Sequence, residues 1–233
     1  MQIVKFRLFF GGTFMKLSRL FVTAGLLVSL ISGVTKGDVF VGGGFALVDF
    51  DDVNSEVGEA SGDISIAGDG RTVASINSVT LTNLTHTWIG DLVVTLEHVE
   101  SGASTVLTSP PDGRSANFNG TYTFLVDAGL QTIDEASLGQ GTAFNLASGN
   151  YAMSNYGGGS AIGPRTDFAA FDGVSLDGTW RLTFFDFVGG DSGALGGWSF
   201  DASAVPEPTS MLLLASVVGL GGLKLKLRRR SEV

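Results

Sequence analysis

The chain contains 233 residues, with 34 glycines, five prolines and no cysteine. The lack of cysteine excludes disulfides, a thiol nucleophile and a cysteine metal site, and only two histidines, His86 and His98, offer imidazole chemistry. Residues 38–205 hold 21 of the 23 acidic residues but four of the 14 basic ones, a formal charge of −17. Because such an acidic segment repels phosphate backbones, we expect no nucleic-acid partner. Binding of divalent cations and simple solubility both remain open as explanations of the charge.

Residues 1–37 are predicted to be a signal peptide. Lys16 and Arg19 precede an apolar run, Leu20 to Ile31, and small residues follow it. A positive start, a short apolar centre and a small-residue exit are typical of secretion signals, and the run is too short to span a bilayer comfortably. Met15 stands where such a signal would begin, so we expect the true start there.

Residues 38–204 are predicted to form an all-β domain. Apolar and polar residues alternate over 79–82 and 92–97, which is the period of strands with one buried face. The polar corner between these two strands carries His86, Trp88 and Asp91. No segment has a long helical period, which favours a β-sandwich or barrel-like domain. Further strands are predicted over 39–50, 63–67, 71–76, 104–108, 121–126, 179–187 and 198–202, and a loop over 139–163.

Residues 205–233 are predicted to be a sorting signal with a transmembrane helix. Met211 to Leu223 is apolar or glycine throughout, and five cations follow within Lys224–Arg230. The positive end should remain cytoplasmic, which leaves the acidic domain outside. Together with Pro206, Glu207 and Pro208, this tail resembles the PEP-CTERM sorting signal. The resemblance implies export in a Gram-negative bacterium, processing near the motif by an exosortase, and release or attachment at the cell surface.

Five short motifs occur in order in the core: His86–Leu92, Phe171–Gly173, Gly178–Leu182, Gly190–Leu195 and Trp198–Phe200. Together they resemble the P domain (P/Homo B domain) found beside subtilisin-like proprotein convertases. The resemblance implies a jelly-roll-like β-sandwich, often calcium-stabilised, that supports or targets a catalytic domain. No subtilisin domain precedes the motifs here, so the protease activity associated with the family is not carried over, and we expect no enzyme.

Four aspartates are candidate calcium ligands: Asp91, Asp127, Asp186 and Asp191. They lie at the ends of predicted strands, where carboxylates can converge on a hard cation. Hydrogen bonding to nearby backbone amides is the simpler explanation for any single one of them. The sequence therefore leaves a calcium cofactor and ordinary turn chemistry both open.

One motif favours a catalytic alternative. Residues 190–193, Gly-Asp-Ser-Gly, match the nucleophile segment of chymotrypsin-like proteases, and His86 lies upstream of Ser192. The expected Gly-Pro continuation is replaced by Ala194 and Leu195, and nothing in the sequence specifies a base and its orienting partner.

We therefore expect an exported, non-catalytic β-sandwich protein with a binding or structural role at the cell surface or in the extracellular matrix. The alternative is a serine-type endopeptidase or an accessory domain of a subtilisin-like protease. The expected partners are an exosortase, the membrane through the C-terminal helix, and extracellular polysaccharide or a protease.

Overall fold

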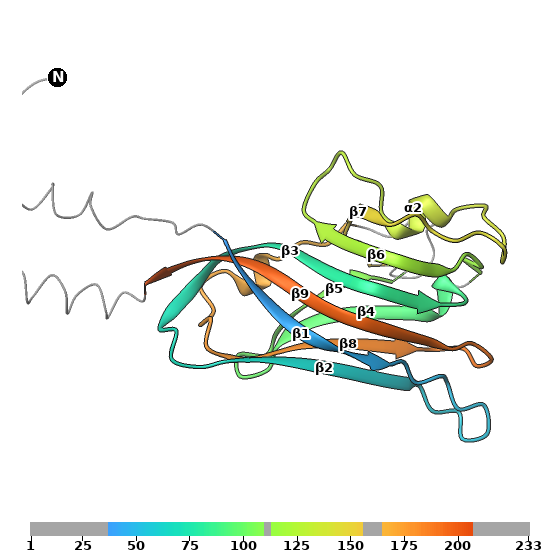
Figure 1. The fold of residues 1–233 in the computed structure, drawn as a ribbon, viewed down its shortest axis with the longest axis horizontal. Coiled ribbons are helices and arrows are strands. Elements are labelled where there is room, and N and C mark those ends of the chain that lie inside the picture. The colour runs from blue at the N-terminus through green and yellow to red at the C-terminus, as the bar shows by residue number, and fades with distance from the viewer. Residues whose placement is uncertain (1–36, 110–112, 156–164, 207–233) are drawn as a thin grey trace, which may run out of the picture. The chain divides into compact units, whose positions relative to one another are not determined.

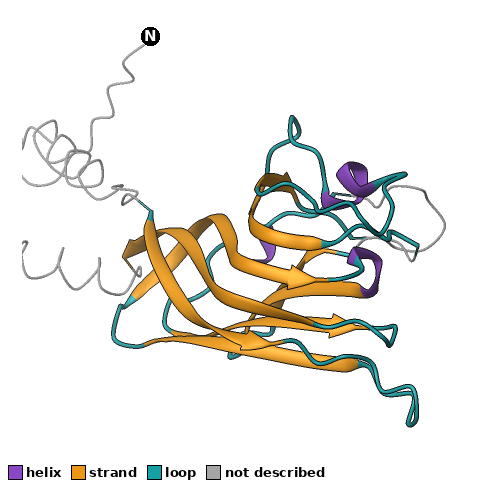
Figure 2. Cartoon of the chain, turned by 45° about the vertical axis from the view of Figure 1, so that its right-hand side comes forward, coloured by secondary structure: helices purple, strands orange, loops and turns teal. Residues whose placement is uncertain are grey.

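A computed structural model describes residues 37–109, 113–155 and 165–206. The predicted signal peptide and sorting helix therefore lie outside the described residues. The described residues form two β-sheets with very little helix (Figures 1 and 2), which confirms the predicted all-β fold class. Within this part of the chain, no helix is long and apolar enough to cross a membrane.

The larger sheet has five strands in the order β1-β9-β3-β6-β7. Neighbouring strands are antiparallel, except that β7 runs parallel to β6. Figure 1 shows β9, the last strand in sequence, lying between β1 and β3. The bounds of the strands are Asp38–Ala46 (β1), Arg71–His86 (β3), Phe118–Leu125 (β6), Gly149–Ala152 (β7) and Gly193–Pro206 (β9).

The smaller sheet has four antiparallel strands in the order β2-β8-β4-β5. Consecutive strands β3 and β4 belong to different sheets, and the short 3-10 helix η2 (Ile89–Asp91) carries the chain across. The other helical segments described are α2 (Ile133–Ser137) and η3 (Ala169–Phe171). The strands are Gly58–Ile66 (β2), Leu92–His98 (β4), Ala103–Thr108 (β5) and Gly178–Asp186 (β8).

The hydrophobic core contains buried side chains from both sheets. Alternation buries one face of each strand, as in β4, where every second residue from Leu92 to His98 is buried. Trp180 on β8 and Phe200 on β9 join the sheets, with ring centroids 4.7 Å apart. Phe45 on β1 meets Phe184 on β8 edge to face at 5.8 Å. The two sheets thus pack over a shared aromatic core.

Several strands differ from the sequence prediction: β1 ends at Ala46 and not at residue 50, and β2 covers Gly58–Ile66 and not 63–67. The separate strands predicted over 71–76 and 79–82 are one strand, β3, which is bulged between Val73 and Ser75 and between Ile76 and Ser78. The predicted loop over 139–163 contains β7, so the loop prediction was wrong at Gly149–Ala152. The last strand is longer than predicted at both ends and continues to Pro206.

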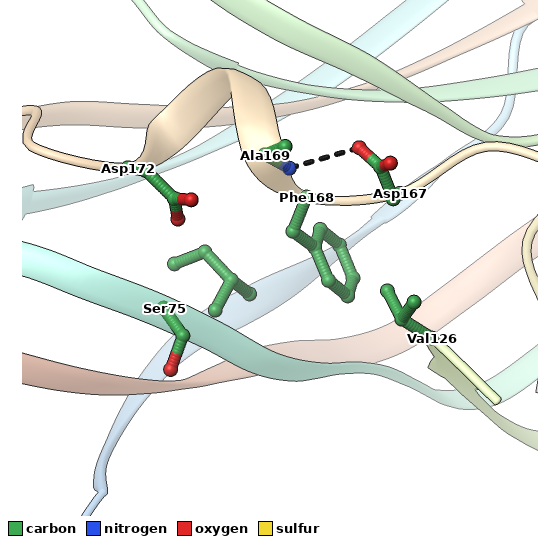
Figure 3. A pocket seen from close by; sticks show the side chains of 7 residues that line it. Ser75, Val126, Asp167, Phe168, Ala169 and Asp172 are labelled. Atoms are coloured by element: carbon green, nitrogen blue, oxygen red, sulfur yellow. Dashed lines mark hydrogen bonds between the residues drawn. The ribbon is translucent and has the colours of Figure 1, made fainter.

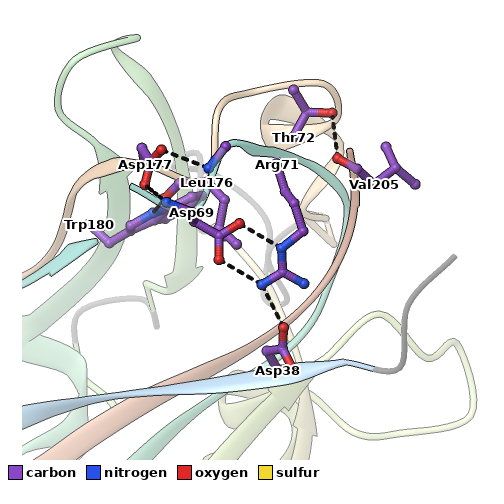
Figure 4. Close-up of polar contacts among 9 residues, drawn as sticks. Asp38, Asp69, Arg71, Thr72, Leu176, Asp177, Trp180 and Val205 are labelled. Carbon is purple, nitrogen blue, oxygen red and sulfur yellow. Dashed lines mark hydrogen bonds and ion pairs between the residues drawn. The ribbon is translucent and has the colours of Figure 1, made fainter. Parts of the chain in front are cut away.

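An arginine fork ties the start of β1 to the turn between β2 and β3 (Figure 4). Arg71 donates to both carboxylate oxygens of Asp69, at 2.6 and 2.7 Å, and to Asp38 at 2.7 Å. The backbone amides of Asp69 and Gly70 donate in turn to Asp177, which precedes β8. Arg71 also pairs in register with Pro206, so β1 begins and β9 ends near this fork.

Candidate functional site

The motif residues around His86 meet at the end of the sheets opposite the Arg71 fork. His86 ends β3 and pairs in register with Gly193 at the start of β9. Asp186 ends β8 and pairs with Leu92, the residue that follows Asp91. We call the group His86, Asp91, Asp186 and Asp191 the acidic corner.

The backbone turns sharply on entry to this corner. Trp88 has a φ of 138°, a strained conformation for a residue with a side chain. The turn is held by backbone bonds from Ile89 to Ala116 at 2.7 Å and from Gly90 to Arg114 at 2.9 Å. This turn places the side chains of Ile89 and Asp91 in the interior of the domain, where both are buried.

His86 is buried between two acceptors. Its Nδ1 lies 3.2 Å from the carbonyl oxygen of Trp88, and its Nε2 lies 3.0 Å from Oδ2 of Asp186. A carbonyl can only accept, so Nδ1 carries a proton and donates it. The backbone amide of Val188 donates to the other oxygen of Asp186 at 3.2 Å. His86 therefore fastens the end of β3 to the end of β8 in the other sheet.

Asp91 is only 2% exposed, and neither of its carboxylate oxygens has a hydrogen-bond donor among the described residues. Burial, reinforced by the nearby charges of Asp186 and Asp191, raises the pKa of Asp91 to about 7. A buried carboxylate without donors is costly. Near neutral pH this position is therefore suited to take up either a proton or a cation.

Asp191 belongs to the same corner, but Asp127 does not. Oδ1 of Asp191 accepts a hydrogen bond from Thr87, and its charge acts on Asp91. Asp127 follows the end of β6, whose first residue, Phe118, pairs with His86. The length of an eight-residue strand, about 25 Å, thus separates Asp127 from the corner. There its side chain accepts from the amide of Gly129 at 2.7 Å.

A further acidic loop, not predicted from the sequence as part of the site, lies at this end. Oδ2 of Asp49 accepts from the amide of Gly190 at 3.0 Å, while its Oδ1 is buried without a partner. Asp52 packs against Gly189. The only signal in the sequence is the acidic run over 49–52, the first two residues of which fall inside the strand predicted over 39–50. Even so, no set of three or more His, Asp or Glu side chains within the described residues is grouped to hold a metal.

The other candidates have different positions. Ser192 lies beside Gly193, which contacts the His86 ring, but both ring nitrogens of His86 bond elsewhere. Pro206 is the last residue of β9, while Glu207 and Pro208 of the sorting motif lie outside the described residues.

Comparison with known proteins gives only distant similarities. No family model matches the chain, and no curated protein matches it. The chain is similar to a structure of the Aeromonas sobria serine protease in complex with its chaperone, with 16% identity and a TM-score of 0.37. That match covers 79% of this chain and 29% of the other. A second structure, of the Aeromonas sobria serine protease, gives 15% identity, a TM-score of 0.34 and coverage of 78% and 29%. The chain thus spans less than a third of the length of these proteins, and the similarity is too distant to indicate a function.

Proposed function

We propose that this chain is an exported, non-catalytic β-sandwich protein with a binding or structural role at the cell surface or in the extracellular matrix. Its core is of the jelly-roll-like, P-domain type. An exosortase processes it near Pro206, Glu207 and Pro208, after the C-terminal helix has held it in the membrane. The proposal combines the motifs of the sequence with the chemistry of the acidic corner.

The state of His86 is the observation that carries the non-catalytic role. An acylating serine needs a base that accepts its proton and a partner that orients that base. His86 lies beside Gly193, the residue after Ser192, but its Nε2 bonds to Asp186 and its Nδ1 bonds to the carbonyl of Trp88. With both nitrogens engaged, the ring is a link between the two sheets.

A fluorophosphonate probe, which labels activated serines, tests the non-catalytic role. We expect the full chain to remain unlabelled, as a Ser192→Ala variant must, while a known serine protease in the same tube is labelled. Labelling of Ser192 that is lost in Ser192→Ala would establish the serine-hydrolase alternative.

Processing is tested separately in the producing bacterium. We expect the wild-type protein to leave the membrane fraction as a shortened species, and a Glu207→Ala variant to accumulate there at full length. A wild-type chain that stays in the cytosol with both ends intact would contradict export and processing together.

Calcium is the cofactor proposed for the acidic corner. The unpartnered, buried oxygens of Asp91 suit a hard cation, and the charges of Asp186 and Asp191 act on the same carboxyl, although the three carboxylates are not grouped as a metal site in the described residues. Asp127 is left out, because it lies at the other end of β6. Bound calcium would neutralise the corner and brace its turn. We expect calcium to raise the melting temperature of the wild type and to have no effect on Asp91→Asn. An equal rise in the melting temperature of the wild type and of Asp91→Asn would place the cation elsewhere.

Extracellular polysaccharide is the partner proposed for the outer face of the five-stranded sheet. One row across this face contains Val41, Ser199, Thr80, Thr123 and Asn150, all uncharged. The hydroxyls of Thr80 and Thr123 are 3.0 Å apart and bonded. In so acidic a domain, an uncharged hydroxyl-bearing row suits a neutral, hydroxyl-rich polymer. Co-sedimentation with matrix polysaccharide should be lost in Thr80→Glu but kept in Ser61→Glu, which adds the same charge to β2 in the other sheet.

A further inference from the structure

The side of β3 that faces β6 has a gap in its hydrogen-bonded ladder. Val73 exchanges backbone bonds of 2.8 Å with Val174 and Gly173, and pairing with β6 starts only at Val79, opposite Phe124. Between these points no described strand pairs with this side of β3. The two bulges of β3 in its pairing with β9 fall in the same stretch. Bulges re-aim side chains, and here the neighbours Ser75 and Ile76 both line one hollow.

The hollow has a volume of about 310 Å³ and an apolar base (Figure 3). Ile76 and Phe168 line it and are 5% and 3% exposed, so they offer a packed floor. Val126, which is 60% exposed, forms a wall where the chain leaves β6.

The rim of the hollow is acidic. Asp167 and Asp172, on either side of η3, are exposed and line the hollow, and Ser75 adds a hydroxyl. Oδ1 of Asp167 accepts from the amide of Ala169 at 3.0 Å, which leaves its second oxygen facing solvent. Among the residues that the structure describes, no lysine or arginine lines the hollow. Two carboxylates over an apolar floor complement a cation carried on an aliphatic stem.

We propose that this hollow binds a lysine or arginine side chain of a partner polypeptide. The methylenes of the bound side chain pack on Ile76 and Phe168, and its charged head lies between Asp167 and Asp172. The charge of −17 on residues 38–205 also attracts a basic partner at distances longer than those of the direct contacts in the hollow. The inference does not depend on export, calcium or polysaccharide, so its failure would leave those proposals standing.

Four dye-labelled pentapeptides, Gly-Ser-X-Ser-Gly with X as lysine, arginine, norleucine or glutamate, test this binding by fluorescence anisotropy against the full chain in nonionic detergent. Norleucine keeps the aliphatic stem and removes the charge. We expect the lysine and arginine peptides to bind and the norleucine peptide to bind about two- to fivefold more weakly, as loss of an exposed ion pair predicts. Equal binding of the lysine and norleucine peptides would overturn the proposal.

A double variant, Asp167→Asn with Asp172→Asn, locates the site. Asparagine keeps an acceptor for the amide of Ala169, and an unchanged melting temperature checks that the fold is intact. We expect this variant to bind the lysine peptide as weakly as the norleucine peptide. The matched control, Asp52→Asn with Glu59→Gln, removes the same charge from exposed positions outside the hollow and should bind as the wild type does. An equal loss in both double variants would mean general attraction to an acidic protein and would refute the site.

Discussion

Burial of the Asp91 carboxyl makes the stability of the fold depend on pH. Its carboxyl is buried without a donor, and its pKa is about 7, compared with 3.8 for an ordinary aspartate. Because the folded state holds the proton more tightly than the unfolded state, the contribution of Asp91 to stability is fully present below pH 3.8. It falls as the pH rises toward 7 and levels off above that.

The first prediction concerns this pH dependence in chelator. Between pH 4 and 7 the free energy of unfolding should fall because of Asp91, by up to about 1.4 kcal/mol per pH unit. In Asp91→Asn, whose amide is neutral at every pH, this loss should disappear. The variant should therefore be more stable than the wild type at pH 8, and similar at pH 4. Urea unfolding at each pH measures both proteins, and parallel pH curves would contradict the prediction.

The residue types of this corner could be predicted from the sequence, but its geometry could not. The Gly-Asp turn and the alternating strands around it were enough to single out His86 and Asp91. The bond from His86 to Asp186 joins residues 100 positions apart, so no local pattern predicts it. Asp127 was grouped with the others because strand ends look alike in a sequence, which does not show at which edge of the domain each strand ends.

The turn that starts β8 depends on the absence of a side chain. Gly178 has a φ of 139°, and a Cβ there would overlap the ring of His98, which bonds through Nε2 to the carbonyl of Asp177 at 3.1 Å. The second prediction is that Gly178→Ala destabilises the fold by about 1–3 kcal/mol. Gly43→Ala is the control, because Gly43 lies in β1 with open space around it and an ordinary φ. Chemical denaturation should show little loss in the control, and equal losses would rule out this cause.

The short helix α2 is held by a capping box. Oγ1 of Thr132 accepts from the amide of Glu135 at 3.1 Å, and Oε2 of Glu135 accepts from the amide of Thr132 at 2.8 Å. The third prediction is that Thr132→Ala costs about 1 kcal/mol, since Thr132 is buried and its loss leaves an amide unpaired. Thr142→Ala, at an exposed position, should cost much less in the same unfolding assay.

Elements with regular alternation were easier to predict than elements defined by their partners. The β8 prediction, 179–187, differs from the observed strand by one residue at each end. The two bulges in β3 shift its buried residues from an odd–even pattern to Val73, Ile76 and Val79, which made one strand look like two. The four residues of β7 are too few to show a period, and they form a strand because β6 lies beside them.

At the scale of the whole molecule, composition predicted the fold class and tertiary contacts decided the sheets. Abundant glycine, few prolines and short alternating runs indicated an all-β domain. The assignment of β3 and β4 to different sheets follows from the His86 corner, where the chain crosses from one to the other. The segment between β6 and β8 lacks strong alternation of apolar and polar residues. Residues of this segment form the acidic hollow together with β3, and such a contact between distant segments leaves no pattern in the sequence. Asp167 could therefore not be predicted as a site residue.

Trp180 is the side chain on which the cohesion of the two sheets most clearly depends. It is fully buried on β8, and its ring lies 4.9 Å from His98, 5.3 Å from Phe171 and 4.7 Å from Phe200 of the other sheet. Its Nε1 donates to the carbonyl of Leu176 at 3.0 Å. With no disulfide to hold the sheets together, their packing must come from such contacts.

The fourth prediction is that Trp180→Ala destabilises the domain by about 3–5 kcal/mol, as expected for a large aromatic removed from a core. Trp180→Phe keeps part of the packing and should cost less. Phe187→Ala removes a half-exposed aromatic next to β8 and is the matched control, with a loss well below that of Trp180→Ala. Because the core is shared, Trp180→Ala should lower the urea midpoint equally when followed by far-ultraviolet circular dichroism and by tryptophan fluorescence. Two separate transitions would show instead that the sheets unfold independently.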